Sequence, residues 1–187
     1  MPVPVFTAGE VLTAANMNQV GLWKIGTFST TSSSNLIVDS VFTSDFTNYR
    51  LVFSEVTGSG VTGLNFGYRS GGSTINANNY YGRRQDFSYA AGGAGGASDA
   101  PNTIHQMCLI ISGNTTSPAS AIIDIFAPQL NTRNTGVIGH GVDARTAGGL
   151  LLYSGFYNAQ TAMDGFLLNA GGQTFTNAVV TVYGYRD

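Results

Sequence analysis

The sequence predicts an all-β protein, an antiparallel β-sandwich of jelly-roll-like type, and three observations carry this prediction. Glycine is abundant (25 residues) and charged residues make up only 10% of the chain, whereas helical surfaces are usually rich in Glu, Lys and Gln. From residue 22 onward, hydrophobic residues recur with a period near two. Clusters of Gly, Ser, Thr and Asn interrupt this alternation at short intervals, as in sandwiches built from short strands and turns.

The chain is expected to have two parts, an attachment segment over 1–21 and a β-sandwich domain over 22–187. A length of 187 residues fits one domain with a short appendage. In the first part, Thr13 can cap a short helix that runs to Val20 and ends at Gly21. Because so short a helix is marginal alone, we expect this docking segment to pack on its own domain or on a neighbour.

Ten strands are expected in the sandwich domain. Tyr49, Leu51 and Phe53 share one face of the third expected strand, and alternation extends that face to Glu55. The closing strand has no polar face, so we expect it to be a central strand or a subunit contact. The predicted strands are 22–28, 36–42, 49–56, 63–69, 104–112, 121–127, 136–143, 150–157, 165–168 and 178–185.

The segment 76–99 departs from this pattern and is expected to project as a loop with a short strand near 86–89. It begins with polar and aromatic residues and ends in a Gly/Ala-rich run over 90–97. Polar-aromatic side chains suit a receptor or subunit contact. The same cluster is also typical of a β-arm that pairs within the chain or between subunits. The candidate contact residues are Asn79, Tyr80, Tyr81, Arg83, Arg84 and Tyr89.

The sequence does not predict an enzyme, a metal site or a cofactor. It has no nucleophile elbow and no phosphate-binding loop with its lysine. His105 and His140 lack zinc-ligand spacing, and we expect both to be strand histidines with satisfied hydrogen bonds. Asp124, in an apolar strand, is the carboxylate whose pKa burial would perturb most, and pairing with an arginine or a backbone amide is the expected outcome.

Charge and composition indicate which kinds of partner the chain can bind. The net charge of −2 and the lack of a basic face argue against nucleic-acid binding. No apolar run is long enough to insert in a membrane, and the first residues lack the pattern of a signal peptide. A single cysteine, Cys108, fits synthesis in a reducing cytoplasm. A surface with so few charges favours assembly with other subunits.

Both ends of the chain resemble tailed-bacteriophage virion proteins. The segment 6–18, FTAGEVLTAANMN, is similar to the opening of tail fibres, receptor-binding proteins and related tail appendages. The segment 178–187, AVVTVYGYRD, resembles their closing hydrophobic strand followed by Tyr-Gly. The resemblance implies a homotrimer with a β-sandwich body, made in the bacterial host cytoplasm and located in the virion.

The resemblance also implies what the chain does there. It implies a short tail fibre, or a tail-tip or adaptor component, involved in assembly and in attachment to a host-surface glycan or protein. The first segment would dock to other phage tail or capsid proteins. The residues implied for docking are Phe6, Val11, Leu12, Ala15 and Met17.

Other functions stay open at this point. A capsid-surface decoration protein, of the head-fibre or cement type, differs from a tail component only in location. A carbohydrate-binding module would bind sugar without any virion. A glycan-cleaving module would release reducing ends through a carboxylate pair, although no spacing in the sequence selects such a pair.

Overall fold

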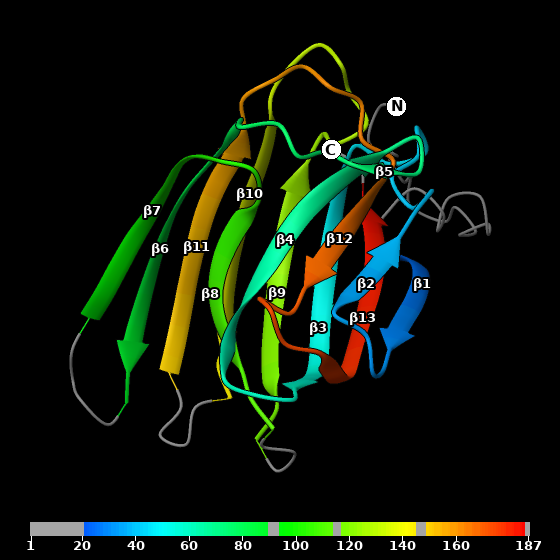
Figure 1. Ribbon diagram of the computed structural model, residues 1–187. Coiled ribbons are helices and arrows are strands. Elements are labelled where there is room, and N and C mark those ends of the chain that lie inside the picture. The colour runs from blue at the N-terminus through cyan, green and yellow to red at the C-terminus, as the bar shows by residue number, and fades with distance from the viewer. Residues whose placement is uncertain (1–20, 90–93, 114–116, 145–148, 186–187) are drawn as a thin grey trace, which may run out of the picture.

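Two antiparallel sheets pack face to face around the core (Figure 1). The computed structural model describes residues 21–89, 94–113, 117–144 and 149–185. The larger sheet has the strand order β1-β13-β3-β9-β10-β11-β6-β7; the smaller one has the order β2-β12-β4-β5, with β8 also paired to β4. The strands are β1 Trp23–Thr30, β2 Asn35–Val38, β3 Asn48–Gly58, β4 Thr62–Ser70, β5 Ser73–Thr74, β6 Tyr80–Ser88, β7 Ala94–Asn102, β8 His105–Ile111, β9 Ala119–Phe126, β10 Thr135–Val142, β11 Gly149–Tyr157, β12 Gly165–Asn169 and β13 Phe175–Tyr185.

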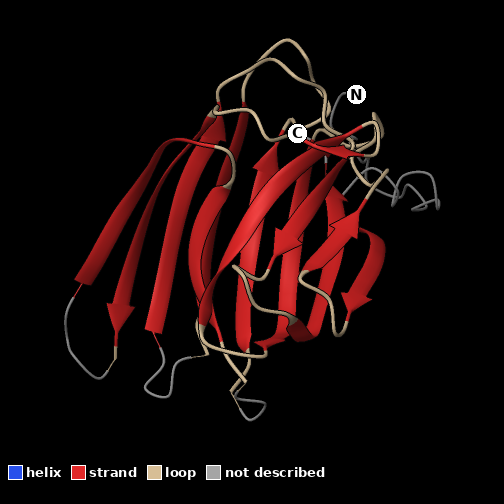
Figure 2. Cartoon of the chain, viewed as in Figure 1, coloured by secondary structure: helices blue, strands red, loops and turns tan. Residues whose placement is uncertain are grey.

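The all-β prediction is confirmed over the described residues. Every pair of neighbouring strands is antiparallel, and no helix occurs in the part of the chain that the structure describes (Figure 2). The expected short helix of the attachment segment falls within residues 1–20, which lie outside the described residues.

Alternation along β3 builds one wall of the core. Tyr49, Leu51 and Phe53 are buried on the inner face, as predicted. The smaller sheet contributes Phe66 and Phe166, whose ring centroids lie 5.9 Å apart at an interplanar angle of 18°. Each such side chain contributes about 2 kcal/mol through removal of apolar area from water. The core between the sheets therefore supplies the main force that holds the sandwich together.

The expected inward position of Glu55 is wrong, because a β-bulge resets the alternation. Glu55 has a φ of 59°, and the pairing of β3 with β9 shifts register between Phe53 and Val56. An extra residue in one strand turns the following side chains to the opposite face. Glu55 is therefore exposed and Val56 is buried in its place.

The closing strand is central, as its two apolar faces predict. β13 lies between β1 and β3 in the larger sheet. Val180 and Val182 are fully buried on its inner face, and Thr181 and Tyr183 are half-buried on its outer face. The inner position Gly184 faces the ring of Phe46, which occupies the space that a Cβ would need.

Most of the segment predicted to form a projecting loop forms two strands instead. β6 pairs with β11 along its whole length, and β7 pairs with β6 at the edge of the larger sheet. The β-arm alternative, paired within the chain, is what the structure has. Glycines suit this edge because a Cβ at Gly95 would lie 2.6 Å from Oδ1 of Asp86. Figure 1 shows β6 and β7 extending to one side, past the part of the larger sheet that the smaller sheet covers.

Candidate functional site

The candidate contact residues of β6 divide between the two faces of the larger sheet. Tyr81 and Arg83 point outward, away from the smaller sheet, while Tyr80 and Arg84 point inward. This division follows from strand alternation, which places consecutive side chains on opposite faces. The cluster that looks continuous in the sequence therefore contributes to two separate surfaces.

Tyr80 belongs to the core and is not available for a surface contact. Its side chain is 0% exposed, its hydroxyl donates to the carbonyl oxygen of Ile75 at 2.8 Å, and it accepts from the amide of Tyr68 at 3.0 Å. Burial raises the pKa of Tyr80 well above its usual range, so the side chain stays a neutral phenol. Its ring packs on Tyr157 with centroids 4.9 Å apart.

The inward face near β6 also holds one of the two histidines. His105, at the start of β8, is fully buried, and its Nδ1 lies 2.5 Å from the hydroxyl of Tyr153. Burial lowers the pKa of His105 to about 3, which keeps the imidazole neutral near pH 7. Both histidines lie within strands, as expected, and His140 is exposed on β10. The expectation that their hydrogen bonds are satisfied is wrong for His105, because its buried Nε2 has no partner among the described residues.

The two remaining candidates flank β6. The carbonyl oxygen of Asn79 accepts a hydrogen bond from the amide of Asn158 at 2.8 Å, which fixes the start of the strand. Tyr89 lies in the turn after β6 with 63% of its surface exposed. Tyr89 is thus available for a contact at this end of the sheet.

Five large hydrophobic side chains are exposed together on the outer face of the larger sheet. They come from the neighbouring strands β9, β10 and β11, and we call this surface the apolar face. Nine large hydrophobic side chains are exposed among the described residues, so more than half of them lie here. The apolar face comprises Phe126, Ile138, Val142, Leu152 and Phe156.

Strand register brings these side chains into adjacent rows. Gly136 on β10 is paired with Phe156 on one side and with Phe126 on the other. Tyr81 of β6 continues that row, because its ring stacks on Phe156 with centroids 5.3 Å apart and an angle of 7° between the planes. An aromatic row therefore crosses the outer face, interrupted only where Gly136 has no side chain.

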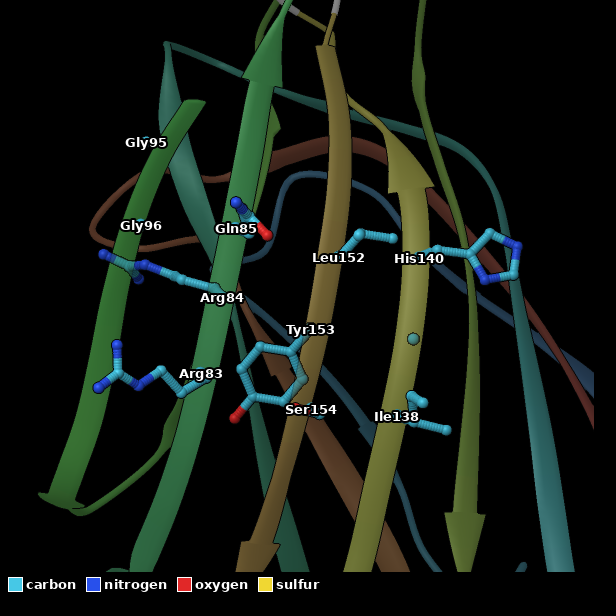
Figure 3. A pocket seen from close by; sticks show the side chains of 11 residues that line it. Arg83, Arg84, Gln85, Gly95, Gly96, Ile138, His140, Leu152, Tyr153 and Ser154 are labelled. Atoms are coloured by element: carbon cyan, nitrogen blue, oxygen red, sulfur yellow. The ribbon is translucent and has the colours of Figure 1, made fainter. Parts of the chain in front are cut away.

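Polar side chains lie between the members of the apolar face on β10 and β11 and next to it on β6. Arg83, Gln85, His140 and Ser154 line a shallow groove of about 590 Å³ whose apolar lining comes from Ile138 and Leu152 (Figure 3). Figure 3 shows which strands supply these side chains: β6 carries Arg83 and Gln85, β11 carries Leu152 and Ser154, and β10 carries His140.

The charges on this face are few. Arg50 and Asp124 form a bidentate ion pair, with both N···O distances at 2.8 Å. Pairing with an arginine, one of the two outcomes expected for Asp124, is thereby confirmed. The hydrogen bond to Asp124 raises the pKa of Arg50. The pair is internally neutral, so the centre of the outer face carries little net charge.

Sequence reasoning missed the apolar face as a unit. The signal was present, because the strands that contain Ile138 and Leu152 have apolar residues on both faces. Strand order was needed to place β9, β10 and β11 side by side. The predicted docking residues Phe6, Val11, Leu12, Ala15 and Met17 all lie outside the described residues.

The described ranges contain no group of three metal-ligating side chains close enough to hold an ion. Within the same ranges there is no helix with the length and apolarity needed to cross a membrane. Comparisons with protein-family models, with curated proteins and with solved structures found no match.

Proposed function

We propose that this chain is a structural component of a phage virion, a jelly-roll-like sandwich that serves as a short tail fibre or as a tail-tip or adaptor protein. The observation that carries the proposal is the apolar face. Exposed apolar side chains gathered on one surface gain free energy when a protein partner removes them from water. The resemblance of segments 6–18 and 178–187 to tail appendages supports a virion as the place of assembly.

We further propose that the partner on the apolar face is a second copy of the chain, in a homotrimer. Only 10% of residues are charged, and the Arg50–Asp124 pair is internally neutral, so copies can approach without strong repulsion. Cyclic closure buries the same surface on every subunit. The remaining surface and the first 21 residues would then be free for host attachment and for docking to other virion proteins.

A matched pair of substitutions tests self-association. Ile138 lies on the apolar face with 50% exposure, and Ile37 lies on the outer face of the smaller sheet with 51% exposure. We expect the purified chain to have the mass of three subunits by light scattering behind a sizing column. Ile138→Asn should shift that mass toward one subunit, and Ile37→Asn should not. A wild-type monomer, or equal shifts in both variants, would contradict assembly through the apolar face.

Labelling of particles tests the virion location. Antibodies raised against the sandwich domain, with immunogold detection on purified phage particles, should mark the tail. Label on the capsid would replace the tail assignment with the decoration alternative. Particles that carry no label, although the chain is made during infection, would overturn the virion proposal.

A further inference from the structure

A row of side-chain amides crosses the outer face of the smaller sheet, on the opposite side of the molecule from the apolar face. Nδ2 of Asn169 on β12 donates to Oδ1 of Asn35 on β2 at 2.9 Å, and Nδ2 of Asn65 on β4 donates to Oδ1 of Asn169 at 3.3 Å. We call these three residues the amide ladder. Register places Gln106 of β8 next to Asn65, so the row continues onto β8.

A backbone amide fixes which way the ladder points. The N–H of Gly171 can only donate, and it donates to Asn169 at 2.9 Å, so that atom of Asn169 must be the carbonyl oxygen Oδ1. Asn65 must then present its NH₂ group to Asn169. Oδ1 of Asn65 is left as an acceptor without a hydrogen-bond partner among the described residues.

Arg84 completes the row from β6. Its Nη1 donates to the main-chain oxygen and to Oε1 of Gln106, each at 3.2 Å. Its Nε is buried and has no partner among the described residues, and no hydrogen bond within them involves Nη2. A groove of about 340 Å³ lies at this point, lined by Arg84, Gln106, Asn65 and Thr62, with Gly63 and Gly171 beside them.

Two other arginines in the structure show which ligand group pairs with the Nε and Nη2 edge of a guanidinium. Arg50 holds Asp124 through Nε and Nη2, and Arg69 holds Asp39 through the same two atoms. This edge of a guanidinium matches the two oxygens of a carboxylate. In Arg84 the Nε and Nη2 edge has no partner among the described residues while Nη1 is anchored. Because Nε is buried, a carboxylate reaches the whole edge only after a small displacement of the side chains that cover it.

We infer that this groove, which we call the Arg84 groove, binds a carboxylate-bearing saccharide. The carboxylate takes the Nε and Nη2 edge of Arg84, while sugar hydroxyls donate to Oδ1 of Asn65 and to the hydroxyl oxygen of Thr62. Uncharged amides and a hydroxyl around one cation suit a ligand with many hydroxyls and a single negative charge. Leu64 also borders the groove but is fully buried, so the lining offers no exposed apolar side chain to anchor a peptide side chain.

The biological meaning of this inference rests on the attachment role in the proposed function, since an acidic saccharide would be a host-surface ligand. Binding itself is measured on the free protein, whereas the proposed function is tested on particles. The two can therefore fail separately. The Arg84 groove also stays open if copies associate through the apolar face, because that face is on the outer side of the larger sheet, whereas Arg84 points to the inner side of that sheet and the amides belong to the smaller sheet.

The experiment compares two sugars that differ in one group. Glucuronic acid and glucose are titrated into the full-length chain, with saturation-transfer NMR and calorimetry as readouts. We expect glucuronic acid to bind at least about tenfold more tightly than glucose, the size expected for one charge-assisted contact. Equal binding of both sugars, or no binding of glucuronic acid up to about 10 mM, would overturn the inference.

Variants locate the site. Arg84→Gln should weaken glucuronic acid binding at least about tenfold, while Arg83→Gln, one residue away on the opposite face of the same strand, should leave it unchanged. Gln106→Glu is a second variant that keeps the shape and places a carboxylate on Nη1 of Arg84, so it should also weaken binding without loss of the fold. Circular dichroism confirms folding of each variant. Loss of binding in Arg83→Gln alone would place the ligand on the outer face of the larger sheet and contradict the inference.

Discussion

The hydroxyl of Tyr153 lies 2.5 Å from Nδ1 of His105, and this contact joins β11 of the larger sheet to β8 of the smaller one inside the core. Aromatic rings enclose the imidazole. Tyr80 meets it edge-on with centroids 4.8 Å apart, and Tyr68 does so at 5.7 Å. Because the surroundings are aromatic and dry, the neutral imidazole is strongly favoured over the charged one.

This burial predicts a loss of stability in mild acid. The pKa of His105 is lowered to about 3 in the folded chain, against about 6.5 when unfolded. Between these values the unfolded chain binds the extra proton, so the free energy of unfolding falls as pH drops from about 6.5 to about 3. The slope approaches about 1.4 kcal/mol per pH unit. Urea unfolding at pH 7, 6, 5 and 4 measures it.

Two variants separate His105 from the carboxylates that also titrate in acid. His105→Phe should be less stable than the wild type at pH 7, because Tyr153 loses its hydrogen bond to the imidazole, but its stability should decline less steeply between pH 6.5 and 5. His140→Gln, which replaces the exposed histidine, serves as the control variant. An unchanged slope in His105→Phe would show that this imidazole does not set the acid limit.

The ion pairs Arg69–Asp39 and Arg50–Asp124 should contribute different amounts to the free energy of unfolding. The side chain of Arg69 is 8% exposed and also donates to Thr74 and to the main-chain oxygen of Gly72, so loss of Asp39 leaves a buried cation short of a partner. We expect Asp39→Asn to lower the free energy of unfolding by about 2 kcal/mol. The side chain of Arg50 is 37% exposed, so Asp124→Asn should lower the free energy of unfolding by less than about 1 kcal/mol.

Denaturant titration of the two variants in low and moderate salt makes the comparison. Added salt should shrink the effect of Asp124→Asn more, because exposed charges are screened more than buried ones. If Asp124→Asn lowered the free energy of unfolding as much as Asp39→Asn, or more, burial of the arginine would not determine how much an ion pair stabilises the fold.

Alternation allowed much of the fold to be predicted from the sequence. Alternation placed Tyr49, Leu51 and Phe53 on one face of β3. Residue type predicted that β13 is a central strand or a subunit contact, and that Asp124 pairs with an arginine or a backbone amide. Strand ends were less predictable: the expected strand over 36–42 ends at Val38 in the structure. Val41 and Phe42 are buried in the connection that follows. They are apolar because they pack in the core, and not because they belong to a strand.

Other features depend on long-range pairing that spacing does not encode. β7 contains AGGASDAPN, which has almost no strand propensity and is a strand because β6 offers an edge to pair with. The amide ladder joins Asn35, Asn65 and Asn169, which are far apart in the sequence and meet only through sheet order. Arg84 was a candidate contact residue, but its partner Gln106 was not identifiable without the pairing of β8 with β4.

Two glycines of β10 should respond differently to alanine. A Cβ at Gly141 would lie 2.5 Å from the main-chain oxygen of Ser120 and 2.7 Å from Cβ of Ala121, so β9 and β10 would have to separate. We expect Gly141→Ala to lower the free energy of unfolding by about 2 kcal/mol. A Cβ at Gly136 would meet Phe126 at 3.5 Å, an ordinary contact, so Gly136→Ala should stay within about 0.5 kcal/mol of the wild type.

Thermal and urea unfolding of both alanine variants, read by circular dichroism, provide the comparison. Gly136→Ala also fills the gap in the aromatic row of the outer face, so its oligomeric mass should be recorded with its stability. A large cost at Gly136 together with a small one at Gly141 would contradict the close approach of β9 to β10.

The bulge at Glu55 predicts a stabilising substitution in β3. A φ of 59° is unfavourable for a residue with a Cβ and open to glycine, and the difference is about 1 kcal/mol. The side chain contributes little in return, because its one hydrogen bond, from Nδ2 of Asn177, is exposed and 3.4 Å long. Glu55→Gly should therefore raise the free energy of unfolding by about 0.5 kcal/mol, measured by urea titration. Ser54→Gly, at the preceding exposed position outside the positive-φ region, should lower it by a similar amount, because glycine there only adds freedom to the unfolded chain. If both variants were destabilised alike, the bulge would not be held in the left-handed conformation in solution.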